Sequence, residues 1–159
     1  MNISIICVGK IKENFYTEAI AEYSKRLSRF CKLNIIEVPD EKIPENASLK
    51  EEELVKEKEG KKIIAKIPAS AFVYTLEIGG KAYSSDEFAS EIASQGLSGN
   101  SHLVFIIGGS LGLSSEVRKL SDSKLSFSKF TFPHQLMRVI LLEQIYRGFK
   151  INANEPYHK

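Results

Sequence analysis

Short apolar runs alternate along the chain with segments in which apolar residues recur at helical spacing. The runs cover residues 3–8, 33–38, 71–78 and 103–107, and each is followed by glycine or proline. Short runs of this kind are typical of strands covered on both faces. They predict four buried strands, of which the third is expected to end at Gly79-Gly80. A fifth short strand is expected at 124–128.

Helical patterns occupy the segments between these runs. Apolar residues recur at helical spacing over 13–29, and capping-box pairs, in which Ser48 precedes Glu51 and Ser84 precedes Glu87, predict two further helix starts. A short helix is expected to begin at Ser114-Ser115, and a last helix at Pro133. Residues 39–46 read as a loop. The alternation predicts a single α/β domain over 1–159, with a mainly parallel sheet and helices on both faces.

The last helix is apolar nearly all round between 136 and 149. Such a helix is buried on more than one side, and we expect a second copy of the chain to supply part of the cover. Glu143 and Arg147 are four residues apart in the favourable order, so we expect them to form an ion pair with each other. Arg138 has no partner along the helix.

Composition excludes several classes of protein. The apolar share of 43% and charged share of 26% are those of a globular chain, and no apolar run approaches a membrane span. The first residues lack the pattern of a secretion signal, so we expect a cytoplasmic protein with no membrane partner. Cys7 and Cys31 have no metal or redox spacing, and no metal cofactor is expected. A net charge of +2 does not indicate a strongly basic nucleic-acid binder.

A cluster of basic residues lies at the end of the first helical segment. Lys25, Arg26 and Arg29 lie near its end, where cations suit the negative end of the helix dipole. A contact with phosphate is the alternative, and Lys10, Lys12 and Lys32 would then join it.

Three glycines follow the fourth run: Gly108, Gly109 and Gly112. Ligands of parallel sheets lie beyond the carboxyl ends of strands, where glycine lets them approach the backbone. A tight turn without a ligand is the alternative. The spacing does not fit the dinucleotide fingerprint, which should follow the first strand.

The segments FIIGGSLGLS, LSFSKFTFPHQLMRVILLEQIYRGFKI and NEPYHK resemble the SPOUT superfamily of RNA methyltransferases, and within it the bacterial ribosomal RNA large subunit methyltransferase H family. The resemblance also includes VGKIKE and VPDEK and covers essentially the whole chain. It implies a homodimeric α/β fold with a C-terminal trefoil knot and S-adenosylmethionine as methyl donor. It further implies methylation of N3 of a pseudouridine in 23S rRNA, without an appended RNA-binding domain.

By this resemblance, three loops hold the cofactor. Their residues are Leu76, Gly108, Phe127, Ser128, Lys129, Phe130, Thr131 and Phe132. Backbone groups of such loops can bind the edge of a base, and apolar side chains can cover it. Core packing is the alternative for Leu76 and Phe132.

The resemblance also makes the PYH tail an active-site element that dimerisation could bring to the partner's pocket. The N3 proton must be removed or shared, and both His158 and His134 are candidates for this role. Arg138 would stabilise developing charge or hold a phosphate, and Tyr157 would contact the base. A frayed terminus is the alternative for the tail, and a plain helix start for His134.

The low net charge indicates recognition of an assembled 70S ribosome by shape, with few phosphate contacts. Three rivals stay open: a SPOUT enzyme acting on tRNA, a non-catalytic RNA-binding factor, and a flavodoxin-like nucleotide module.

Overall fold

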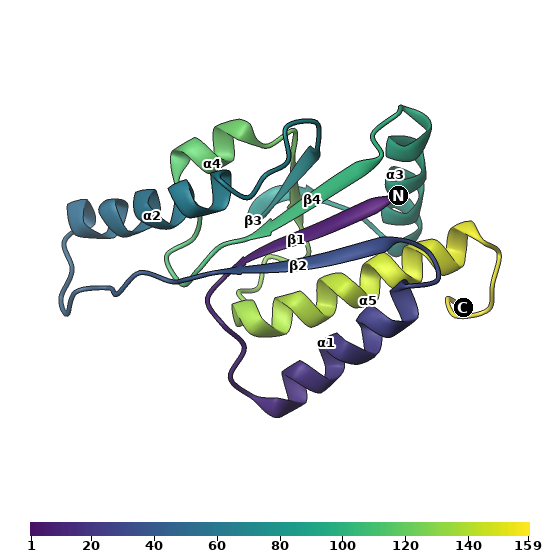
Figure 1. The fold of residues 1–159 in the computed structure, drawn as a ribbon, viewed down its shortest axis with the longest axis horizontal. Helices are drawn as coiled ribbons and strands as arrows, with labels where there is room; N and C mark the ends of the chain where they lie inside the picture. The colour runs from purple at the N-terminus through teal and green to yellow at the C-terminus, as the bar shows by residue number, and fades with distance from the viewer.

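Five strands and five helices follow one another along the chain, which the computed structural model describes over residues 1–159 (Figure 1). The strands are β1 (Asn2–Val8), β2 (Lys32–Val38), β3 (Phe72–Ala82), β4 (His102–Ile107) and β5 (Ser123–Ser126). The helices are α1 (Asn14–Leu27), α2 (Leu49–Ile64), α3 (Ser85–Leu97), α4 (Ser115–Leu120) and α5 (His134–Asn152). Every predicted element is present, with ends that differ by a few residues.

All the strands are parallel. They form one sheet in the order β2-β1-β4-β3-β5, in which β4 is central and β1 and β3 flank it. The predicted parallel sheet is therefore confirmed. Because the strands share one direction, their carboxyl ends meet at a single edge, where ligands of such sheets bind.

Two hydrophobic cores cover the two faces of the sheet. Ile3 and Ile5 of β1 point to the face packed by α1, α3 and α5, whereas Ile6 and Val8 point to the face packed by α2 and α4. This two-residue alternation is the geometry of a strand, and here both faces are apolar. Figure 1 shows α1 beside α5 and α2 beside α4, in agreement with their contacts. Helices on both faces are thus confirmed.

The predicted end of the third strand was wrong. β3 continues through Gly79-Gly80 to Ala82, with an irregularity in its pairing to β5 between Leu76 and Lys81. Gly80 passes so close to β5 that a Cβ atom there would lie 2.7 Å from the carbonyl carbon of Lys124. The glycine therefore permits the β3 and β5 backbones to approach closely. In a sequence, a glycine with this role cannot be distinguished from a glycine in a turn.

Side-chain caps start three helices as the sequence predicts. Ser48 with Glu51 and Ser84 with Glu87 form complete capping boxes, and the hydroxyl of Ser114 accepts from the backbone N–H of Val117. Each cap satisfies donors that would otherwise lack partners at a helix start.

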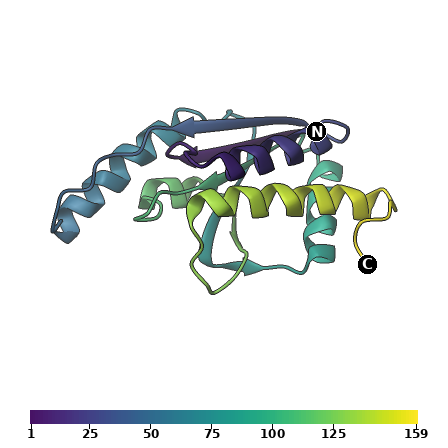
Figure 2. The ribbon, with the colours of Figure 1, turned by 90° about the horizontal axis from the view of Figure 1, so that it is seen from below.

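The helix α5 lies between α1 and α3 on the sheet, so much of its apolar surface is covered within the chain (Figure 2). Leu136, Val139 and Ile140 stay half-buried. A second copy of the chain is therefore expected to cover only these three half-buried residues of α5. Cys7 and Cys31 are buried free thiols. None of the helices combines the length and apolarity needed to cross a membrane.

Candidate active site at the carboxyl edge of the sheet

A pocket of about 610 Å³ lies beyond the carboxyl ends of β3, β4 and β5. Its walls come mainly from three segments: residues 76–79 of β3, which lie beyond the pairing of this strand with β4, the glycine turn after β4, and the connection between β5 and α5. Its volume lies in the range of small-molecule sites, about 300–1,000 Å³. The parallel sheet brings these segments together because each of them continues past the pairing of neighbouring strands at the same edge.

Most of the residues assigned to a cofactor line this pocket. They are Leu76, Gly108, Phe127, Ser128, Phe130, Thr131 and Phe132. Lys129 is exposed and does not line it. Phe130 is 79% exposed at the pocket, although it is a large apolar side chain. The structure therefore gathers residues that are about 50 positions apart in the chain into one cavity.

The glycine segment is a tight turn, as one reading of the sequence has it, and it also lines the pocket. Contact of this turn with a ligand stays a prediction. The N–H of Gly112 donates to the carbonyl of Gly109 at 3.0 Å, and Gly112 has a φ of +87°. A Cβ atom on Gly108 would lie 3.1 Å from the carbonyl carbon of Gly112. Side chains at these positions would strain or open the turn.

An ion pair stands at the pocket wall. The Arg118 Nε lies 2.7 Å from the Glu77 Oε1, and the Thr75 hydroxyl donates to the other carboxylate oxygen at 3.1 Å. The Glu77 side chain is 12% exposed and that of Arg118 is 50% exposed. The pocket thus presents one largely buried carboxylate and one half-exposed guanidinium.

His134 is the predicted catalytic residue that lines the pocket within the same chain. It is the first residue of α5, and its Nε2 faces Gly9. Burial, followed by the nearby positive charge of Arg138, lowers its pKa. A histidine with a lowered pKa is neutral at pH 7 and can accept a proton.

Arg138 is 1% exposed and does not line the pocket. Its guanidinium donates to the carbonyls of Val8 at 3.0 Å and Gly9 at 2.7 Å, and to Glu37 Oε2 at 3.0 Å. Glu37 also accepts from the N–H of Ile11. The hydrogen-bond partners of Arg138 thus come from the end of β1, the residue after it, and β2, and not from α5. Arg138 fastens the loop after β1 to the start of α5.

The C-terminal tail is tied down at the opposite end of α5. The hydroxyl of Tyr157 donates to Glu143 at 3.0 Å, and its ring packs edge-on against Tyr146 at 4.9 Å. His158 Nδ1 lies 3.1 Å from Arg147, whose guanidinium lies over the ring of Tyr157. Burial and the neighbouring hydroxyl and carboxylate raise the pKa of Tyr157. The tail is therefore an ordered part of the structure, not a frayed end.

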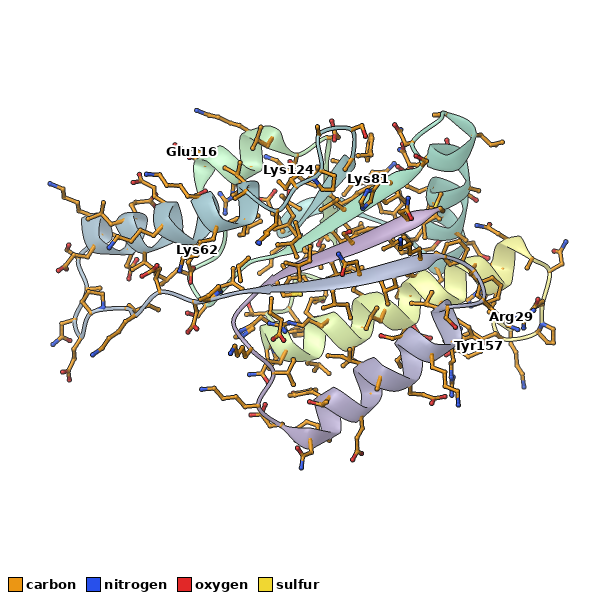
Figure 3. All side chains as sticks on the ribbon, in the orientation of Figure 1. Arg29, Lys62, Lys81, Glu116, Lys124 and Tyr157 are labelled. Carbon is orange, nitrogen blue, oxygen red and sulfur yellow. The ribbon has the colours of Figure 1, made fainter.

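The tail and the pocket of one chain lie far apart. The 19 residues of α5 separate them, which corresponds to about 27 Å at 1.5 Å per residue. Figure 2 shows the connection before α5 at one end of the helix and the C-terminus at the other. In Figure 3, Lys124 at the pocket and Tyr157 in the tail are widely separated. Tyr157 and His158 therefore cannot act in their own chain's pocket in this conformation.

Comparison with known proteins gives a match over nearly the whole chain. A family model described as "Predicted SPOUT methyltransferase" matches residues 1–158. The chain belongs to the SPOUT methyltransferase family. Proteins named ribosomal RNA large subunit methyltransferase H from Clostridium novyi (strain NT) and Clostridium kluyveri are 62% and 58% identical to it over 159 residues, the full length of both chains in each comparison.

A solved structure of a probable methylase family protein from Haemophilus influenzae Rd KW20 has the same fold. Its TM-score is 0.56 at 10% identity, and the match covers 99% of this chain and 70% of that one. The resemblance inferred from the sequence is confirmed, as is the α/β fold. The trefoil knot stays a prediction.

Sequence reasoning did not assign some of the residues that line this SPOUT pocket. They include Glu77, Ile78, Leu111, Arg118 and Met137. One signal was available for the ion pair, because Glu77 is a charged residue inside an apolar strand run and Arg118 lies just beyond the glycine turn. A carboxylate buried in such a run must be paired, so Glu77 predicts a nearby cation.

Proposed function

We propose that this protein transfers the methyl group of S-adenosylmethionine to N3 of a pseudouridine in 23S rRNA, in the assembled 70S ribosome, and that it acts as a homodimer. One observation carries the proposal. A chain that aligns end to end with proteins named for methylation of large-subunit rRNA also gathers its expected cofactor loops into one pocket. A ribosomal substrate implies work in the cytoplasm.

The pocket residues fit the cofactor's chemistry. S-adenosylmethionine, when bound, supplies an electrophilic methyl group and carries an adenine, an ammonium and a carboxylate. Leu76, Phe127 and Phe132 would cover the adenine, and the glycine turn would let it lie against the backbone. Glu77 and Arg118 supply the charges opposite to those of the ammonium and the carboxylate. Such a pocket mainly aligns the donor carbon with the acceptor nitrogen and excludes water.

The acceptor nitrogen must lose its proton during transfer. The neutral imidazole of His134 is in the pocket, which makes it the candidate base from the same chain. His158 and Tyr157 are candidates only from a second chain. Arg138 would act by holding the loop after β1 in place, because its guanidinium is buried against that loop.

A second copy would bring a tail to the pocket. The half-buried residues Leu136, Val139 and Ile140 lie on α5 at its pocket end. An antiparallel pairing of α5 with α5 of a second copy, about a two-fold axis near the middle of the helix, would place each tail near the other chain's pocket. The family's knotted topology would hold the pocket loops rigid.

The function is tested by transfer of labelled methyl groups to 70S ribosomes, separated 50S subunits and bulk tRNA, with mass spectrometry of the product nucleosides. Methylpseudouridine formed only with 70S ribosomes is expected. Label in tRNA would mean that the protein is a methyltransferase with a different target RNA. No label in any RNA, from protein that binds the cofactor, would favour a binding factor instead.

The action of the tail across the dimer is tested by complementation. A chain lacking residues 154–159 keeps its pocket, and Gly108→Val disrupts the glycine turn but keeps the tail. Each homodimer is expected to be inactive. An equal mixture should recover about one quarter of wild-type activity, since half of its dimers are mixed and each of these has one complete site. A mixture as inactive as its components, with mixed dimers present, would contradict the composite site.

A further inference from the structure

A second groove, of about 860 Å³, lies between the end of α1 and the beginning of β2. The residues that line it include Ser24, Ser28, Arg29 and Lys32, and none of them carries a carboxylate. Cations and hydroxyl groups donate hydrogen bonds to phosphate oxygens. Half of the lining residues are apolar, and the Ser28 hydroxyl already donates to the carbonyl of Lys25, so the groups that can donate to an anion are Ser24, Arg29 and Lys32.

The region around the groove carries more positive than negative charge. Lys25, Arg29, Lys32 and Lys150 contribute four cations, whereas one carboxylate, that of Glu155, is paired with both Arg29 and Lys150. Lys25 and Lys32 are exposed and form no ion pair. The whole chain has 22 basic and 20 acidic residues, so this region carries a larger surplus than the entire protein does.

The end of α1 does not account for this surplus. A helix terminus carries a charge of about half a unit, and Arg26 in the last turn already forms an ion pair with Glu22. Arg29 and Lys32 lie beyond the last residue of α1. The cations therefore exceed what the helix dipole requires.

The groove is linked to the tail through Arg29. Arg29 binds Glu155 of the tail segment at 2.8 Å, and Figure 3 shows Arg29 and Tyr157 close together at the end of α5. The ring of Phe30 stacks on Phe149 with centroids 5.6 Å apart, which fixes the turn after α1 against α5. A strand of RNA that reached Tyr157 would pass directly onto this groove.

We propose that the groove binds the phosphate backbone of the substrate RNA next to the target nucleotide. The inference rests on the proposed function, because it takes RNA as the substrate and the tail as the element beside the target. In the composite site, the tail would bring the groove of one chain to the pocket of its partner. The groove would supply phosphate contacts from within the methyltransferase domain itself.

The test uses the double variant Lys25→Gln/Lys32→Gln. Both side chains are exposed and without partners, so the fold and the tail should be unaffected. Lys50→Gln/Lys58→Gln on α2 is the matched control, since it removes the same charge from two exposed lysines elsewhere. Binding to 70S ribosomes is measured by co-sedimentation at several salt concentrations. The kcat and KM for methyl transfer and the affinity for S-adenosylmethionine are measured with the same proteins.

Each lost phosphate contact should weaken binding about 5- to 8-fold at about 0.1 M salt, so the double variant should bind about 25- to 60-fold more weakly. The slope of log affinity against log salt should fall by roughly 1.4 to 1.8. KM for ribosomes should rise, while kcat and cofactor affinity stay at wild-type values. The control should match the wild type.

Equal ribosome affinity and equal salt slope in the double variant and the control would overturn the inference. Its failure is distinguishable from failure of the proposed function. If the wild-type protein methylates tRNA, the proposed target is wrong, yet weaker tRNA binding by the double variant would still support the groove. If the wild type methylates ribosomes and the double variant does so equally well, only the groove is wrong.

Discussion

The neighbouring glycines of β3 offer a matched pair of substitutions. A Cβ atom on Gly80 would lie 2.7 and 2.8 Å from the carbonyl carbon and oxygen of Lys124, whereas one on Gly79 would meet nothing within 4 Å. Ordinary contacts begin near 3.4 Å, so Gly80→Ala must move the β3 and β5 backbones apart by about 0.7 Å. Gly79→Ala lowers the conformational entropy of the unfolded chain by the same amount, but it creates no clash in the folded state.

Overpacking of this kind costs about 1–3 kcal/mol, and the effect on unfolded-chain entropy cancels between the two variants. With a urea dependence of about 2 kcal/mol per molar, the unfolding midpoint of Gly80→Ala should lie about 0.5–1.5 M below that of Gly79→Ala. The chain has no tryptophan, so unfolding is followed by far-ultraviolet circular dichroism. Both variants are measured at one protein concentration, because the stability of the proposed dimer would depend on concentration.

The same substitution should reach the pocket. Lys124 and Leu125, the residues that would be displaced, line it, so Gly80→Ala should also weaken cofactor binding. Midpoints that agree within about 0.2 M would refute the reasoning, because they would mean that β3 and β5 do not approach each other as the structure describes.

Two further predictions concern α5. Arg138→Ala should lower the free energy of unfolding by about 3–5 kcal/mol, because it leaves the carbonyls of Val8 and Gly9 without their buried donor. Arg26→Ala, which removes an exposed ion pair, should change it little in the same urea titration, and equal effects would contradict the buried clamp. Because the pKa of His134 is lowered by burial, the unfolded chain takes up a proton near pH 6.5 before the folded chain does. Its contribution to stability is complete above pH 6.5 and declines as pH falls through the folded pKa, so His134→Gln should reduce the loss of stability between pH 7 and pH 5; an unchanged pH profile would contradict this.

Local sequence determined where the elements are and where they start. The apolar runs marked the strands because both faces of a parallel sheet are covered, and serine with glutamate three residues later marked two helix starts. The family resemblance, carried by the glycine loop and the PYH tail, indicated the pocket loops that the structure gathers together. Each of these features depends on residues close together in the chain, or on segments distinctive enough to be recognised.

Tertiary structure alone decided which distant groups meet. Gly79-Gly80 resembled a strand end, and only the approach of β5 shows why the strand continues through it. Arg138 lacked a partner in its own helix because its partners follow β1 and lie on β2, more than 100 residues earlier. The basic residues after α1 resembled an ordinary helix end until folding placed them around a groove beside the tail. Contacts between residues far apart in the chain depend on the order and direction of the strands, which local patterns do not encode.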